Sequence, residues 1–130
     1  MSETDTLKEW LNIAEHDLET AKVINLHLPE FIDIITFHCQ QAIEKYLKAY
    51  LIFLGINFKF SHDLVYLLDL VSEKDNKFKS YYEIFSEIQN YAVEIRYPNK
   101  KIFPTKEKVE IAIQAAEEIR EIVQKIVKDY

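Results

Sequence analysis

The chain has 130 residues and a formal net charge of −6, with 48% hydrophobic and 29% charged residues, the balance of a folded globular protein. Gly occurs once and Pro three times, which excludes glycine-rich phosphate-binding loops and a series of tight β-hairpins. The acidic balance argues against sequence-independent binding of nucleic acid, which usually needs a basic surface, and leaves room for a local basic pocket. We expect a single helical domain over residues 1–130.

The compartment and the absence of a membrane span follow from a few residues. The single cysteine, Cys39, cannot form an internal disulfide, which fits a reducing compartment. No apolar run approaches the ~18 residues of a membrane span, and the polar, acidic start Met1-Ser2-Glu3 is unlike a signal peptide. One Cys and four scattered His do not form a convincing zinc ligand set. We expect a cytoplasmic protein without metal or cofactor.

The first half of the chain predicts two long helices. Apolar residues at helical spacing predict the first from Thr4 or Asp5 to Asn25, and Pro29 prevents its continuation. The second runs from about residue 30 to residue 54, and Gly55 is placed to act as its left-handed C-cap. This second helix is apolar around much of its circumference, which is typical of a central helix or of one that contacts a second chain.

The second half predicts one short and two longer helices. Ser61-His62-Asp63-Leu64 opens the short helix with Ser61 as a cap, and the polar run 72–77 reads as a loop. A fourth helix begins near Tyr81 and ends near residues 96–98, and Thr105 caps a fifth helix with a narrow apolar seam. We expect an all-α, up-and-down four-helix bundle with an additional short helix, and a homodimer.

Several polar residues occupy positions where apolar ones are expected. Asp17 falls within the core-facing arc of the first helix, where a carboxylate needs a donor unless it reaches water at the edge. His38, Gln41 and Lys45 share one stripe of the second helix. Such a stripe is either a binding site or a polar seam of the bundle, and a lone helical His is more often structural.

A third element of this candidate site comes from the end of the fourth helix, where Arg96 is followed by Tyr97 and Pro98. The Arg at a helix C-terminus also simply complements the helix dipole. We expect Asp17, His38, Gln41, Lys45 and Arg96 to converge, with Tyr97 beside them. In this arrangement the negative charge of Asp17 balances Lys45 and Arg96. His16 and His27 are expected at the surface, and His62 is expected to be structural, satisfied by a neighbouring loop.

Four segments resemble the HEPN domain family (higher eukaryotes and prokaryotes nucleotide-binding). Ala14–Ala21 (AEHDLETA) resembles its first-helix pattern and Phe37–Ala49 (FHCQQAIEKYLKA) its second-helix signature. Ser61–Leu64 and Arg96–Pro98 resemble later landmarks in the expected order. The resemblance covers nearly the whole chain. It implies an all-helical bundle that usually forms a homodimer.

The family resemblance does not extend to the catalytic motif of HEPN ribonucleases. Many of these metal-independent enzymes use an Arg followed, after four to six residues, by a His. Here every His precedes Arg96 in the chain, so no His follows Arg96 at such a distance. The Arg-Tyr-Pro landmark instead resembles small stand-alone prokaryotic HEPN proteins that are encoded beside a minimal nucleotidyltransferase in toxin–antitoxin-like pairs.

Three hypotheses follow, in this order of preference. The first is a homodimeric, non-catalytic or weakly active partner of a small nucleotidyltransferase. The second is a ribonuclease with a rearranged site, in which His38 acts as general base on RNA while Lys45 or Arg96 stabilises the developing charge. The third is a nucleotide-binding protein without catalysis, with the same cations on phosphate and Tyr97 or Tyr46 on the base.

Overall fold

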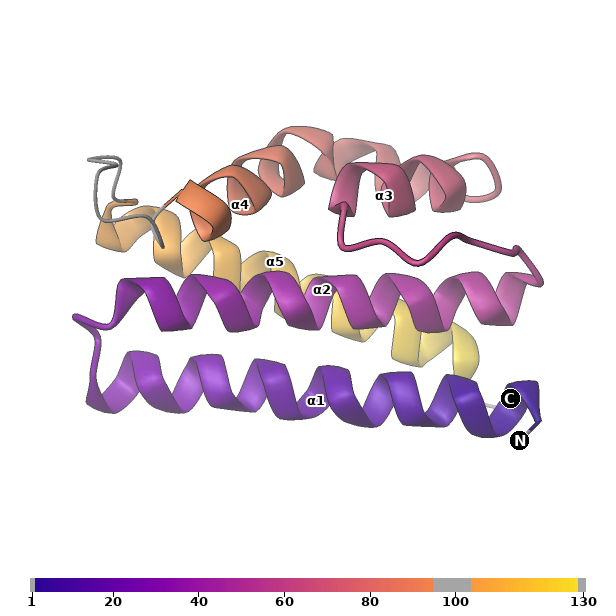
Figure 1. Cartoon of the computed structure of the whole chain (residues 1–130), viewed down its shortest axis with the longest axis horizontal. Coiled ribbons are helices and arrows are strands. Elements are labelled where there is room, and N and C mark those ends of the chain that lie inside the picture. Colours follow the sequence, from indigo (N-terminus) through magenta and orange to yellow (C-terminus); the bar gives the residue numbers. More distant parts are fainter. Residues whose placement is uncertain (1, 95–103, 129–130) are drawn as a thin grey trace.

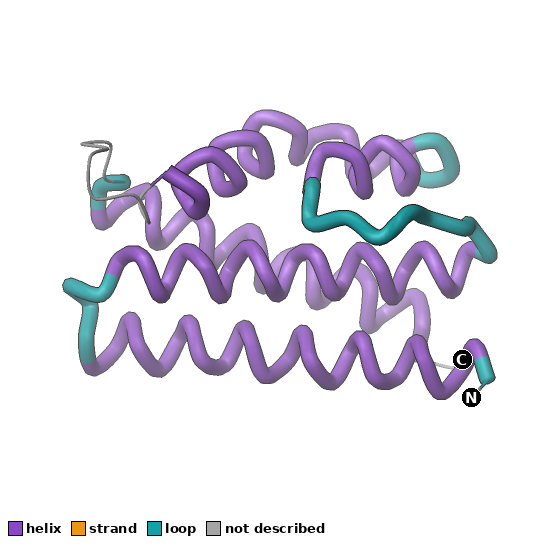
Figure 2. Tube along the Cα trace, viewed as in Figure 1, coloured by secondary structure: helices purple, strands orange, loops and turns teal. Residues whose placement is uncertain are grey.

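The computed structural model of the chain describes residues 2–94 and 104–128. In chain order the helices are α1 (Glu3–His27), α2 (Ile32–Leu54), α3 (Leu64–Ser72), the 3₁₀ helix η1 (Asn76–Tyr81), α4 (Tyr82–Glu94) and α5 (Lys106–Val127). None of the described residues lies in a strand (Figure 2). The expected all-helical class is therefore confirmed, whereas the up-and-down four-helix bundle stays a prediction.

Helices α1 and α2 form an antiparallel hairpin that makes the most extensive helix–helix contact of the fold (Figure 1). The Ser2 side chain caps α1 by accepting from the Asp5 amide at 3.1 Å. The helix ends at His27, two residues later than expected, with Leu28 as its C-cap just before Pro29. The short turn that follows lets α2 return along the side of α1.

Helix α2 is the central helix. It contacts α1 on one side, α5 on another, and α3 and α4 on a third, as Figure 1 shows for its neighbours. Its buried apolar residues are accordingly distributed around the helix rather than along one stripe. The apolar circumference that suggested a second chain is thus covered largely within this chain, and the homodimer remains a prediction.

The junctions on either side of α3 differ in detail from expectation. Asp63, not Ser61, is the N-cap of α3, since its carboxylate accepts from the amides of Val65 and Tyr66. Ser61 Oγ instead accepts from the Asp63 amide and supports the cap. The expected loop at 72–77 is shorter, because Asp75 caps η1 through the Lys77 amide.

Helix α5 packs behind α2 in the view of Figure 1, with Thr105 as the expected cap. Its narrow seam is buried at Val109, Ala112, Ala116, Ile119 and Val123. In the described part of the chain, no helix has both the length and the apolar character needed to cross a membrane.

Candidate functional site

The first site pair joins α1 to α2. Asp17 Oδ1 lies 2.9 Å from His38 Nδ1, and both side chains are partly buried. The core-facing carboxylate of Asp17 therefore has its donor within the chain. When the imidazole is neutral, Nδ1–H donates to Asp17 and the lone pair resides on Nε2, the arrangement that orients a histidine base.

The second pair lies two turns further along α2. Lys45 Nζ donates to Gln41 Oε1 at 2.6 Å, so these two residues meet as their shared stripe predicts. Lys45 pairs directly with Glu44 rather than with Asp17, since Glu44 Oε2 lies at 3.2 Å, and the wider charge balance that includes Arg96 stays a prediction. Asp17 is already engaged by His38 and lies further along the hairpin.

These pairs belong to one line of contact that we name the α1–α2 seam. On α2 it comprises residues at alternating spacings of three and four, which place them on one face: His38, Gln41, Lys45, Lys48 and Ile52. On α1 it comprises, in the opposite direction, Asp17, Trp10, Thr6 and Glu3. The antiparallel hairpin brings the two rows together, as the Asp17–His38 pair and the Trp10–Lys48 contact show.

Glu44 is the residue that the sequence analysis missed. Its side chain is 0% exposed, and it accepts from Lys45, from Lys48 at 3.1 Å and from His62 Nδ1 at 3.0 Å. His62 is thus held by α2 rather than by a neighbouring loop. The available signal was the Glu44–Lys48 pair at i, i+4 in the middle of the most apolar helix, where charges need partners.

The charges around Glu44 decide its ionisation. Burial alone would raise the pKa of this carboxyl, but the charge of Lys45 and the hydrogen bond and charge of Lys48 outweigh burial. The His62 hydrogen bond acts in the same direction, and the pKa of Glu44 falls below its ordinary value. Glu44 is therefore a buried carboxylate that stays ionised at neutral pH.

Two aromatic rings cover Lys48, whose side chain is only 3% exposed. Its ammonium lies 5.1 Å from the ring centroid of Trp10 and 5.7 Å from that of Phe60, both within cation–π range. Phe60 also meets the imidazole of His62 edge to face at 5.2 Å. The segment before α3 thus places the Phe60 ring near Lys48 and the His62 imidazole against Glu44.

A separate polar network ties three helices together. Glu15 Oε1 on α1 accepts from Tyr46 Oη at 2.7 Å, from Arg120 Nε at 2.7 Å and from Gln124. Tyr46 is fully buried, and burial followed by its bond to Glu15 raises the pKa of its phenol. Tyr46 is therefore not available to stack on a base, as the nucleotide-binding hypothesis supposed.

The remaining residues that the sequence analysis considered are not part of the α1–α2 seam as described. Arg96 and Tyr97 lie outside the described residues. His16 and His27 are exposed, as expected. Burial raises the pKa of the Cys39 thiol to about 12, so Cys39 is a core residue rather than a nucleophile. Within residues 2–94 and 104–128, no three His, Cys, Asp or Glu side chains are grouped as metal ligands would be.

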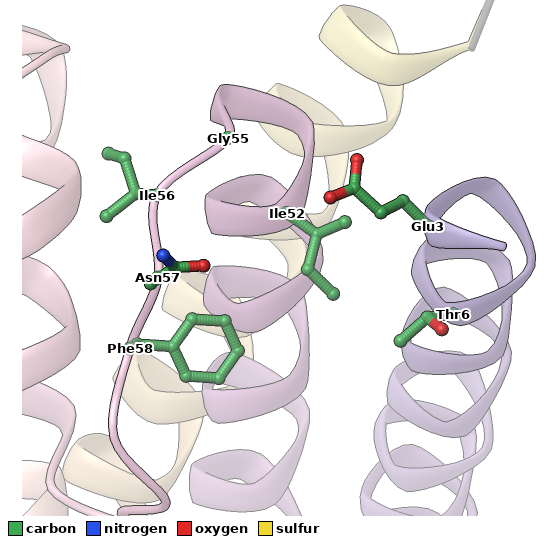
Figure 3. Close-up of a pocket in the computed structure, with 7 residues that line it drawn as sticks. All are labelled: Glu3, Thr6, Ile52, Gly55, Ile56, Asn57 and Phe58. Atoms are coloured by element: carbon green, nitrogen blue, oxygen red, sulfur yellow. The ribbon is translucent and has the colours of Figure 1, made fainter. Parts of the chain in front are cut away.

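The far end of the seam opens into a cavity of about 290 Å³ (Figure 3). Glu3 and Thr6 face it from α1, Ile52 from α2, and Phe58 from the segment after Gly55. No lysine, arginine or histidine is among its lining residues. The basic residues of the seam therefore begin one helical turn away from this cavity, at Lys48.

Comparison with known proteins gives consistent findings. The sequence model of the HEPN domain matches residues 7–126. The chain is 28% identical to "Putative toxin MJ1304" of Methanocaldococcus jannaschii, over 94% of this chain and 88% of that protein. Among solved structures, the crystal structure of ST0689, described as an archaeal HEPN homologue, superposes with a TM-score of 0.68. That match covers 92% of this chain and 95% of the other at 20% identity, and it supports the fold.

Proposed function

Since this chain belongs to the HEPN domain family, we propose that it is one half of a toxin–antitoxin-like pair whose other half is a minimal nucleotidyltransferase. The observation that carries the proposal is the similarity to a relative named as a toxin, which spans nearly the full length of both proteins. The Arg-Tyr-Pro landmark supports the nucleotidyltransferase as partner, because it resembles the HEPN branch encoded beside such enzymes.

The proposal is tested first in the genome and then in cells. We expect the neighbouring gene to encode a small nucleotidyltransferase. Induction of this chain alone should slow growth, and co-expression of that neighbour should restore growth and yield a complex that co-purifies. The same co-expression is repeated with a nucleotidyltransferase whose catalytic carboxylates have been replaced. If this inactive partner still restores growth, it counteracts this chain by binding; if it does not, nucleotidyl transfer is required. The proposal would be contradicted if induction did not slow growth and no complex co-purified.

A second candidate function, metal-independent RNA cleavage, is favoured by one contact. Asp17 holds His38 Nδ1 at 2.9 Å, which leaves Nε2 as a base that could accept a 2′-hydroxyl proton. The missing Arg-to-His spacing weighs against it. We therefore rank a non-catalytic or weakly active protein first.

Cleavage assays decide between these two functions. We expect the purified protein to cleave neither structured nor single-stranded RNA efficiently in the presence of EDTA. The matched variant is His38→Ala, with His16→Ala as the control because His16 is exposed on α1 and outside the seam. Robust cleavage that His38→Ala abolishes and His16→Ala preserves would reverse the ranking.

A further inference from the structure

The charges around Glu44 do not balance. Its Oε2 lies within 3.2 Å of Lys45 Nζ, Lys48 Nζ and His62 Nδ1, so the two ammonium groups and the imidazole surround one carboxylate. One negative charge therefore faces two fixed positive charges, and a third whenever His62 is protonated. This local excess lies in a chain whose overall charge is −6.

Burial separates the roles of these groups. Lys48 is 3% exposed and lies between two aromatic rings, so it serves as the internal counter-charge of Glu44. Lys45 is 12% exposed and His62 is 60% exposed, so the excess positive charge is on the solvent side of the cluster. Lys45 shares the single carboxylate of Glu44 with Lys48, so its charge is only partly compensated, and an anion from solution would complete the compensation.

We propose that Lys45 and His62 form a binding site for a phosphate monoester. Both groups are held by the same carboxylate, so their donors are pre-positioned side by side, Lys45 through Nζ–H and protonated His62 through Nε2–H. When His62 is protonated, the two positive charges on the solvent side match a phosphate dianion better than a carboxylate, which carries one charge. Gln41, whose Oε1 accepts from Lys45, leaves its amide N–H groups to donate to the same anion.

Phe60 extends the site beyond the phosphate. Phe60 is 89% exposed although it is a large apolar residue, and its ring lies near both Lys48 and His62. A planar ring attached to the phosphate could stack on it, as bases stack on exposed aromatic side chains. Sugar phosphates and nucleotides both carry the phosphate monoester that the site would bind, but only nucleotides carry a base that could stack on Phe60.

Titration calorimetry with inorganic phosphate tests the site in the intact chain. We expect saturable binding, accompanied by a change in the fluorescence of Trp10, which is the only tryptophan and contacts Lys48. Lys45→Gln should weaken phosphate binding at least ~10-fold, as expected for the loss of a charged hydrogen bond. Lys125→Gln removes the same charge from an exposed position on α5 and should leave the affinity unchanged.

Two further variants keep the test independent of folding defects at Lys45. His62→Gln alters a mostly exposed residue and should also weaken phosphate binding ~10-fold. Phe60→Ala should leave the affinity for ribose 5-phosphate unchanged. If AMP binds more tightly than ribose 5-phosphate in the parent protein and Phe60→Ala removes that difference, the site recognises a base as well as a phosphate.

Several outcomes would overturn the proposal. It fails if phosphate does not saturate, if acetate at equal ionic strength gives the same response, or if Lys125→Gln weakens binding as much as Lys45→Gln and His62→Gln do. These results leave the partnership with a nucleotidyltransferase untouched, because that partnership is measured by growth and co-purification.

Discussion

Glu44 is a buried carboxylate in the middle of the most apolar helix, and it determines where its cationic partners lie. A carboxylate with no exposed surface would be strongly unfavourable without partners. Lys48 and His62 come to it from α2 and from the segment before α3, so the ion cluster also fixes that segment against α2. Removing Glu44 would leave Lys48 buried and uncompensated, which is where the largest penalty arises.

Neutralising Glu44 should therefore destabilise the protein more than removing the charge pair. We expect Glu44→Gln to lower the free energy of unfolding by ~3–5 kcal/mol, because Lys48 is left as a buried, unpaired ammonium. The double variant Glu44→Gln/Lys48→Met should recover part of that loss, since the second change removes the orphaned charge. Urea unfolding curves measure both. A double variant less stable than Glu44→Gln would show that Lys48 contributes chiefly by packing.

The lowered pKa of Glu44 predicts a specific acid sensitivity. The stability that this carboxylate contributes is present above its ordinary pKa of 4.5 and is lost as pH falls through the lower pKa of the folded state. Unfolding measured between pH 7 and pH 3 should therefore show a fall in stability below about pH 4.5 that is smaller in Glu44→Gln. Parallel pH curves for the two proteins would contradict this role.

At the scale of the elements, the end of α2 depends on the backbone of one residue. Gly55 has φ +72°, the left-handed conformation that other residues adopt only with strain. Its amide bonds to the Ile52 carbonyl at 3.0 Å, and the Ile56 amide bonds to the Leu51 carbonyl at 2.9 Å, which satisfies the last turn. The chain then turns into the segment that carries Phe60 and His62.

Replacement of Gly55 isolates the cost of this conformation. A Cβ at this position would meet nothing within 4 Å, so no steric clash contributes. We expect Gly55→Ala to cost ~1 kcal/mol in thermal or urea unfolding and Gly55→Asn to cost less, since Asn tolerates the left-handed region. Equal losses for Ala and Asn would indicate that something other than the φ angle sets the penalty.

At the scale of the whole molecule, exposed apolar residues gather where α1 ends and α5 begins. Val23 and Leu26 are both exposed, and they line a cavity of about 600 Å³ together with Pro29 and Ile113. Glu19, Lys22 and Glu110 line the same cavity, and exposed apolar residues rimmed by polar ones are typical of a protein–protein contact. Since α2 is covered by its own chain, this end of the molecule is a better candidate for self-association than the central helix.

We expect sedimentation equilibrium at micromolar concentration to show a dimer of the 15.5 kDa chain. Leu26→Glu should shift the equilibrium towards monomer, because it places a charge in the apolar contact. Phe60→Glu makes the same chemical change at an exposed apolar residue on another part of the chain and should leave the dimer intact. A monomer at all concentrations would exclude the homodimer.

The helices and the signals at their ends follow from short-range patterns in the sequence. Spacing of apolar residues placed the helical segments, and the short-range chemistry of Thr105 and Gly55 correctly marked a cap at each of two helix ends. The stripe of His38, Gln41 and Lys45 was also readable, because residues three and four apart share a face of a helix. These properties depend on neighbours within one or two turns.

Which charged side chains meet depends on how the helices pack. Asp17 and His38 are 21 residues apart, and Glu44 and His62 are 18 apart, so no local spacing connects either pair. The sequence placed Asp17 opposite Lys45, whereas packing of α1 along α2 set it against His38 and gave Lys45 to Glu44. A buried charge takes the nearest donor in space, and that donor is fixed only when the helices pack.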